Sequence, residues 1–220
     1  TRPQIAAAGY DATDLFAAGF SIQDLSDSTV FTRPEIAAAG YEAIDLFAAS
    51  FTIQDLSDST VFTRPQIAAA GYETSDLFAA SFSIQDLSDS TVFTRPQIAA
   101  AGYDATDLFA SNFSIQDLSD STVFTRLQIA AAGYSAANLY DASFTIQDLS
   151  DGGFLRSEIA VLGYSAIDLY DASFTIQDLS DSGVFTRTQV ASAGYSAFEL
   201  KLAEFTAKEL LDADFTVANL

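Results

Sequence analysis

The sequence contains no cysteine, methionine, tryptophan or histidine. Without cysteine, this segment can form neither a disulfide nor a thiolate metal site. Without histidine, it also cannot assemble a Ser-His-Asp or Cys-His catalytic centre. The lack of cysteine and methionine suits exposure to oxidants. That property favours a location outside the cell or on the surface of a cell or particle.

Basic residues are scarce as well, because 9 of them stand against 30 acidic residues and leave a net charge of −21. Such a surface repels nucleic acid and anionic membranes, and it attracts cations or basic partners. Aspartate also interrupts every apolar stretch before the roughly 18 residues that a membrane span needs. We therefore predict no nucleic-acid binding and no membrane span, and we interpret the excess charge as an aid to solubility.

The sequence is dominated by a 31-residue repeat that occurs seven times. The copies start at Thr1, Thr32, Thr63, Thr94, Thr125, Leu155 and Thr186. A fixed period of this kind predicts an open stack of small units, not one enclosed active site. Because identical copies offer no two distinct environments for a pair of catalytic carboxylates, we expect no enzyme activity and no cofactor.

Each copy consists of three versions of a ten-residue phrase that has the pattern of a helix start. Ser21 can cap the first turn of a helix, while Asp24, three residues later, reaches back toward the cap. Phe20 and Leu25 flank this pair as a hydrophobic staple. Gly19 closes the phrase before it, where a helix stop favours a residue that tolerates positive φ. The phrase therefore predicts a helix of about seven residues and then a short turn.

Helices this short depend on packing, because isolated helices need roughly 12–15 residues to be even marginally stable. We predict an all-α solenoid with three short helices in each 31-residue copy and about seven stacked copies. The three helices either close one turn of a coil or form a zigzag without a threefold turn. In both arrangements the repeated aromatic and leucine positions form ladders in the core: Phe20, Phe51, Phe82, Phe113, Leu25, Leu56, Leu87 and Leu118.

The array reads as one domain, residues 1–220, with three parts. Residues 1–124 are near-identical copies, and residues 125–185 are diverged. One diverged copy is a residue short at Gly152 and Gly153, so we expect an irregular turn near 151–154. Residues 186–220 carry the lysines and resemble the polar cap that an open stack needs for solubility. The start at Thr1, on a repeat boundary, is typical of a processed product or an excerpt from a longer array.

Each copy has one arginine at the first helical position, which is the unfavourable end of the helix dipole for a cation. An aspartate near the end of the preceding helix is equally misplaced for an anion. Their spacing across a turn predicts repeated salt bridges, each worth only about 0–1 kcal/mol at the surface but able to fix register as a network. The predicted pairs are Asp27 with Arg33, Asp58 with Arg64, Asp89 with Arg95, and Asp120 with Arg126.

A second set of aspartates is left without arginine partners in this interpretation: Asp14, Asp24, Asp45, Asp55, Asp76, Asp86, Asp107 and Asp117. A regular array of carboxylates attracts Ca²⁺, which prefers oxygen ligands. The sequence lacks the alternating Asp-x-Asp-x-Asp-Gly spacing of a dedicated calcium loop. We therefore predict that any Ca²⁺ binding is non-specific and that no residue serves as a dedicated metal ligand.

The phrase Ala-Gly-Tyr-Ser-Ala-x-x-Leu occurs at 132–139 and again at 193–200. It resembles the tandem AGFSxxEL decapeptides of long repetitive proteins of bacteria and large viruses. The resemblance extends over the whole chain and implies a helical repeat architecture. It implies no single activity, and no functional residues follow from it.

Two functions fit these observations. The first is a non-enzymatic structural or protein-binding scaffold, a rigid acidic solenoid that self-assembles or forms part of a larger surface or filament protein. The alternative is an acidic ladder that binds cations, mineral or a basic partner, including by mimicry of nucleic acid. The first predicts a protein partner or self-association. The second predicts a response to calcium beyond the effect of ionic strength.

Overall fold

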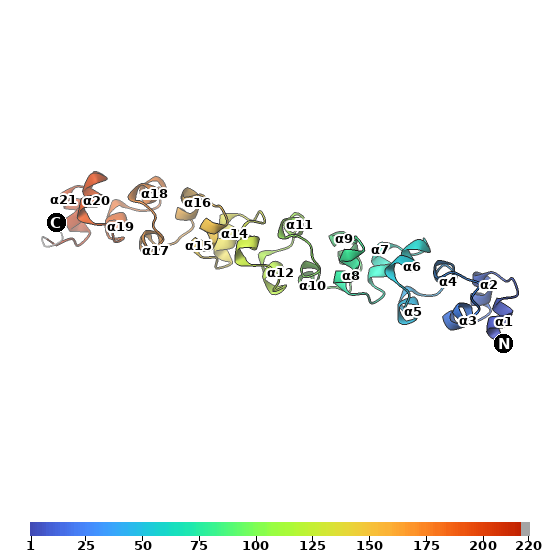
Figure 1. Ribbon diagram of the computed structural model, residues 1–220. Coiled ribbons are helices and arrows are strands. Elements are labelled where there is room, and N and C mark those ends of the chain that lie inside the picture. Colours follow the sequence, from blue (N-terminus) through green and yellow to red (C-terminus); the bar gives the residue numbers. More distant parts are fainter. Residues whose placement is uncertain (217–220) are drawn as a thin grey trace. The chain divides into compact units, whose positions relative to one another are not determined.

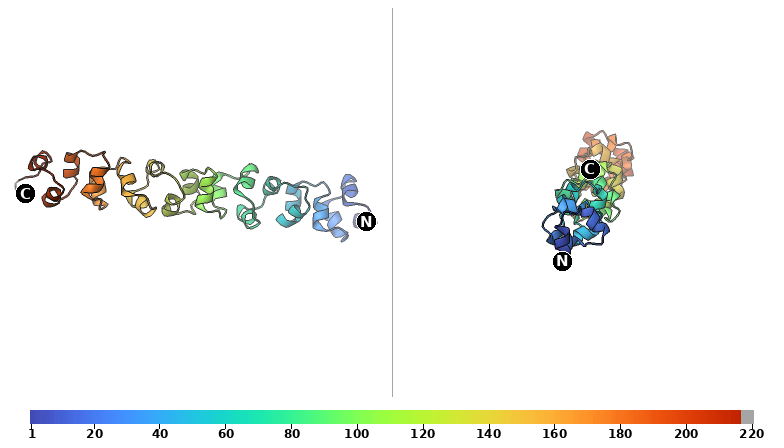
Figure 2. Two further views of the ribbon diagram at one scale, coloured as in Figure 1. Left: turned by 90° about the horizontal axis from the view of Figure 1, so that it is seen from above. Right: turned by 90° about the vertical axis from the view of Figure 1, so that its right-hand side faces the viewer.

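The computed structural model describes residues 1–216 and divides into two compact units, Thr1–Val123 and Phe124–Leu220. The described residues form 21 α-helices and no β-strand. Within each unit the helices follow one another in sequence order (Figures 1 and 2). The boundary between the units falls one residue before the sequence changes from near-identical to diverged copies.

Each 31-residue copy contains three helices, as the phrase predicted. The first helices are α1 (Arg2–Ala6), α4 (Arg33–Ala37), α7 (Arg64–Ala68), α10 (Arg95–Ala99), α13 (Arg126–Ala130), α16 (Arg156–Ala160) and α19 (Arg187–Ala191). The second helices are α2 (Ala12–Ala17), α5 (Ala43–Ala48), α8 (Thr74–Ala79), α11 (Ala105–Ala110), α14 (Ala136–Asp141), α17 (Ala166–Asp171) and α20 (Ala197–Leu202). The third helices are α3 (Ile22–Asp27), α6 (Ile53–Asp58), α9 (Ile84–Asp89), α12 (Ile115–Asp120), α15 (Ile146–Asp151), α18 (Ile176–Asp181) and α21 (Ala207–Asp212).

The helices have five or six residues, slightly fewer than the predicted length of about seven, because the residue at each end is a half-helical cap. At α3 the Ser21 N–H donates to Asp24 Oδ2 over 2.9 Å, and the Asp24 N–H donates back to Ser21 Oγ over 3.1 Å. These reciprocal bonds satisfy N–H groups that a helix start leaves without partners. The second helices of the first four copies lack a side-chain bond at the cap, which is Asp11, Glu42, Glu73 or Asp104.

Two helix pairings dominate the packing within each unit. The first helix of each copy packs on the third helix of the same copy, as α4 does on α6 and α16 on α18. The third helix also contacts the helix that follows it, as α3 does α4. Residues about two ten-residue phrases apart therefore meet. Equivalent helices of successive copies, 31 residues apart, are not among the main packing pairs, although the period had led us to expect them to stack. Of the two predicted arrangements, this pattern favours the zigzag over a threefold turn.

The core consists of the aromatic and leucine positions singled out in the sequence. Leu25, Leu56, Leu87 and Leu118 are fully buried. Phe51, Phe82 and Phe113 are buried as well, with 2–3 % of their surface exposed. Phe20 is only half-buried, because fewer helices precede it in the structure. Small alanines such as Ala37 and Ala68 fill the remaining buried positions of the first helices.

Left-handed backbone recurs at the helix ends, and glycine supplies only part of it. Gly9 and Gly19 have φ of 98° and 78°, as their placement at helix stops predicted. At the position of Gly19 in later copies stand residues with side chains, such as Ser50 with φ 64°. Thr29 and its equivalents, including Thr60, also adopt φ near 61°, although threonine is strained in this region.

At 151–154, where the missing residue led us to expect an irregular turn, the turn differs from those after the other third helices. Gly152 ends α15 in the right-handed region, Gly153 has φ 89°, and the Phe154 N–H donates to the Leu149 carbonyl over 3.1 Å. The same bond follows α2, where the Phe20 N–H donates to the Leu15 carbonyl. The deletion therefore converts the longer turn after a third helix into the shorter turn that normally follows a second helix.

Candidate functional site: three contacts that join helices

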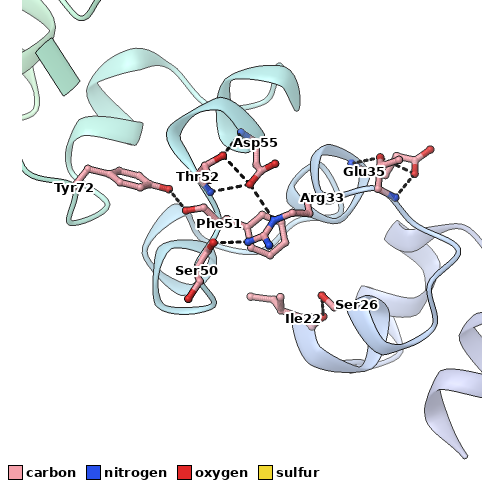
Figure 3. Close-up of polar contacts among 10 residues, drawn as sticks. Ile22, Ser26, Arg33, Glu35, Ser50, Phe51, Thr52, Asp55 and Tyr72 are labelled. Atoms are coloured by element: carbon pink, nitrogen blue, oxygen red, sulfur yellow. Dashed lines mark hydrogen bonds and ion pairs between the residues drawn. The ribbon is translucent and has the colours of Figure 1, made fainter. Parts of the chain in front are cut away.

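One arginine in each copy holds a first helix to the third helix of that copy. In the second copy, the Arg33 guanidinium lies 4.2 Å from the centroid of the Phe51 ring, and its Nε lies 2.9 Å from Asp55 Oδ2 (Figure 3). Arg33 also donates a hydrogen bond to the carbonyl of Ser50, the left-handed residue at the end of α5. We call this arrangement the arginine cluster. It recurs in all seven copies, with guanidinium-to-ring distances of 3.9–5.0 Å.

The arginine clusters correct the predicted salt bridges. The carboxylates bound by arginine are those at the third position of the third helices, 22 residues after each arginine: Asp24, Asp55, Asp86, Asp117, Asp148, Asp178 and Glu209. The predicted partners have another role: Asp27, Asp58, Asp89 and Asp120 accept hydrogen bonds from glutamines one turn earlier. The arginines Arg33, Arg64, Arg95 and Arg126 do not pair with them. Each instead contacts an aromatic ring, a backbone carbonyl and a carboxylate that lie about two phrases later in the chain.

Each cluster carboxylate serves two purposes at once, since it also caps its own helix. Asp86 accepts from the Ser83 N–H and the Ser83 hydroxyl over 2.8 Å each, and Arg64 Nε lies 3.0 Å away. Burial alone would raise the pKa of Asp86, but the bonds from Ser83 and Arg64 outweigh it and lower the pKa. In the last copy, the Thr206 N–H, with Arg187 and the Thr206 hydroxyl, lowers the pKa of Glu209 to about 2.

Within each unit, a second contact joins a second helix to the following first helix through an aromatic ring and a glycine. A Cβ on Gly71, at the end of α7, would lie 2.8 Å from Cε1 of Phe47 in α5. The Phe47 ring also meets the Tyr72 ring edge-on, with centroids 4.8 Å apart. Glycine is therefore needed here both for φ of 119° and for the close approach of the ring.

Within each unit, a third contact joins a third helix to the following second helix through a tyrosine hydroxyl. The Tyr72 hydroxyl donates to the Phe51 carbonyl over 2.6 Å, beside the arginine cluster of Arg33 (Figure 3). Burial, together with the charge of Asp55, raises the pKa of Tyr72 to about 12, although Arg33 acts in the opposite direction. The same bond is made by Tyr41, Tyr103, Tyr164 and Tyr195.

These contacts divide the predicted aspartate ladder into two groups. Asp24, Asp55, Asp86 and Asp117 lie in arginine clusters. Asp14, Asp45, Asp76 and Asp107 lie exposed in the first turn of the second helices. Within residues 1–216, no group of three or more acidic side chains is placed to hold a metal ion. No helix in that range is long and apolar enough to cross a membrane.

The sequence carried a signal for the true arginine partner that the six-residue spacing obscured. The distance from arginine to cluster carboxylate is 22 residues in every copy, including Arg126 to Asp148 and Arg156 to Asp178. The distance from the aspartate at a helix end to the next arginine is not constant. It is six residues from Asp27 to Arg33 but five across the short turn before Arg156. The constant 22-residue spacing therefore indicates the contact that recurs in every copy, whereas the variable spacing does not.

The comparisons with known proteins agree with this repeat architecture. Residues 153–220 match the family model described as a decapeptide repeat region. No curated protein and no solved structure matches the chain. The matched residues include the phrase at 193–200, and the helices that recur along the described chain are consistent with a decapeptide-repeat protein.

Proposed function

We propose that this chain of decapeptide repeats is a non-enzymatic structural or protein-binding scaffold. The main support is that the recurring polar and aromatic side chains form contacts between helices of the chain itself. Arginine clusters, ring-to-glycine contacts and tyrosine hydroxyl bonds together join each helix of a unit to the next but one. A chain whose distinctive side chains hold its own helices together is suited to keep fixed distances between surface positions.

A distance measurement tests this proposal directly, and the lack of cysteine makes it simple. Cysteines introduced at two exposed helix ends, Ala18→Cys and Ala80→Cys, carry spin labels within residues 1–123. A scaffold gives one narrow distance distribution that is the same at low salt and at 1 M salt, where the Debye length is about 3 Å. Removing two arginine clusters between the labels, with Arg33→Ala and Arg64→Ala, should broaden it. A broad distribution in the parent chain would contradict the proposal.

The proposal includes self-association or a place in a larger surface or filament assembly. Exposed valines supply apolar surface for such contacts: Val30, Val61, Val92 and Val123 are each 52–53 % exposed. Sedimentation velocity over a range of protein concentrations measures self-association. We expect larger species to form as salt screens the net charge of −21. Monomers at all concentrations and salt levels would leave binding of a different protein as the scaffold's role.

The alternative, an acidic ladder for cations, mineral or a basic partner, is supported by the exposed carboxylates of Asp14, Asp45, Asp76 and Asp107. The other half of the predicted ladder is occupied by arginine, which is why we favour the scaffold. The alternative requires millimolar Ca²⁺ to raise the melting temperature more than a monovalent salt of matched ionic strength. An equal rise with both salts would reject it.

A further inference from the structure

We propose that two hollows in residues 124–220 each bind a cationic side chain, arginine in the first place, of a basic partner segment. This inference rests on the proposed binding role of the scaffold and assigns it a location and a ligand chemistry. The fifth and sixth copies differ from the first four at the end of the second helix, where the pair Phe-Ala, as in Phe47-Ala48, becomes Tyr140-Asp141 and Tyr170-Asp171.

Both changed tyrosines line a hollow of the same kind. The first, with a volume of about 690 Å³, is lined by Tyr140, Tyr164 and Gln147, with the carboxylates of Asp141 and Asp168. In the second, with a volume of about 640 Å³, the equivalent positions are Tyr170, Tyr195, Gln177 and Glu199. The hollow is thus built twice, except that Asp171, the counterpart of Asp141, does not line the second one.

The aromatic walls of each hollow have a fixed geometry. Tyr140 and Tyr164 meet edge-on with ring centroids 4.8 Å apart and an interplanar angle of 83°. Tyr170 and Tyr195 do the same at 4.8 Å and 81°. The hydroxyls of Tyr164 and Tyr195 are held by backbone carbonyls. The hydroxyls of the two changed tyrosines have no hydrogen-bond partner within the described part of the chain, and both rings are half-buried.

The chemistry of the hollows matches a guanidinium better than an anion or an apolar group. Aromatic faces attract cations, and a carboxylate and an amide oxygen accept the hydrogen bonds that arginine donates in several directions. The chain already uses this combination internally, because Arg156 lies over the Phe174 ring and binds Asp178. Phe144 and Phe174 also line the hollows, but the arginines that lie over their rings, Arg126 and Arg156, are paired with Asp148 and Asp178. The net charge of −21 adds a general attraction for a basic partner.

The test compares two variants with equal charge. The hollow variant carries Tyr140→Phe, Asp141→Ala, Tyr170→Phe and Asp171→Ala, which restore residues that the first four copies tolerate. The control variant carries Asp27→Ala and Asp58→Ala on exposed helix ends of residues 1–123. Each variant removes two negative charges, so both change the net charge from −21 to −19. A difference between them therefore cannot come from general electrostatics.

The probes are a short peptide of alternating arginine and glycine and the same peptide with uncharged citrulline in place of arginine. Binding is followed at physiological ionic strength by calorimetry and by tyrosine emission, which no tryptophan obscures. We expect the arginine peptide to bind the hollow variant about tenfold more weakly than the parent and the control variant. The citrulline peptide should bind none of them.

Two results would overturn the inference. One is equal binding of the arginine peptide to the parent and to the hollow variant. The other is an equal loss in both variants, which would show attraction to net charge alone. Neither result touches the scaffold proposal, because the distance between labels at positions 18 and 80 is measured without any ligand and in the other unit.

Discussion

Arg64 and Asp86 lie 22 residues apart and share one ion pair, with Arg64 Nε 3.0 Å from Asp86 Oδ2. The same guanidinium lies 4.1 Å from the centroid of the Phe82 ring. The Arg64 side chain is 46 % exposed, so its charge pair alone is worth little. Ring, carbonyl and carboxylate are bound together, and that combination gives the arginine cluster its effect.

Replacing Arg64 by alanine should lower the free energy of unfolding by about 1–2 kcal/mol, as the ion pair, the ring contact and the carbonyl bond are lost together. Arg64→Lys should recover only part of this, because an ammonium lacks the planar fork that reaches all three partners. Urea unfolding followed by circular dichroism measures both. Gln85→Ala, which removes an exposed bond to Asp89, serves as control and should change stability by less than about 0.5 kcal/mol. Equal effects of all three substitutions would contradict the role given to the cluster.

Stability should fall between about pH 10 and pH 12. Tyr72, Tyr103 and Tyr195 have their pKa raised to about 12, first by burial. A raised pKa means that the folded state favours the protonated hydroxyl. The stabilisation is complete below the unfolded pKa near 10 and is lost as pH rises through 12. Tyr72→Phe should lessen the fall in urea midpoint between pH 9 and pH 11. The absorbance difference between parent and variant should titrate near 12, and a midpoint near 10 would refute the assignment.

Thr60→Gly should stabilise the chain. Thr60 has φ 61°, where a β-branched residue is strained by roughly 1–2 kcal/mol. Part of that gain is offset, because glycine adds about 0.5–1 kcal/mol of entropy to the unfolded state. We therefore expect a net gain of about 0.5–1 kcal/mol in urea unfolding. The chain supplies the reverse experiment: Gly183 takes the equivalent position with φ 69°, and Gly183→Thr should lose a similar amount. A gain from both substitutions would be inconsistent with backbone strain.

Glu42→Ser should add the hydrogen bond that is missing at the start of α5. The Glu42 side chain makes no cap bond, although its backbone has the extended conformation of a cap. In α17 the equivalent Ser165 accepts from the Asp168 N–H over 3.1 Å. We expect a gain of about 1 kcal/mol over Glu42→Ala, which removes the same charge without supplying an acceptor. Thermal unfolding of the two variants measures the difference, and equal melting temperatures would rule out the cap.

The sequence pattern predicted those features that depend on residues close together in the chain. Ser21 and Asp24 are three positions apart, so their reciprocal bonds follow from the local helix start. Leu25 and Leu56 are buried because one face of each short helix is apolar. Such features need no knowledge of how one helix sits on another.

The contacts between helices could not be derived in the same way. A 31-residue period states how often the chemistry recurs, but it does not state which helices touch. The Tyr72 hydroxyl donates to the backbone carbonyl of Phe51. Every residue type has such a carbonyl, so the sequence does not identify this partner. Left-handed Ser50 was missed because the helix stop was assigned to glycine alone, whereas the contacts of the arginine cluster hold serine there.

Contacts between next-but-one helices divide the helices of residues 1–123 into an odd-numbered and an even-numbered series. Because a copy has three helices, like helices change series from one copy to the next: α1 and α7 are odd, α4 and α10 even. A given side chain returns to its own series only after 62 positions, as Arg2 does at Arg64. A partner that contacts only one series would therefore find a given side chain every 62 residues, which is twice the 31-residue period. Gain or loss of one copy would transfer every later side chain to the opposite series.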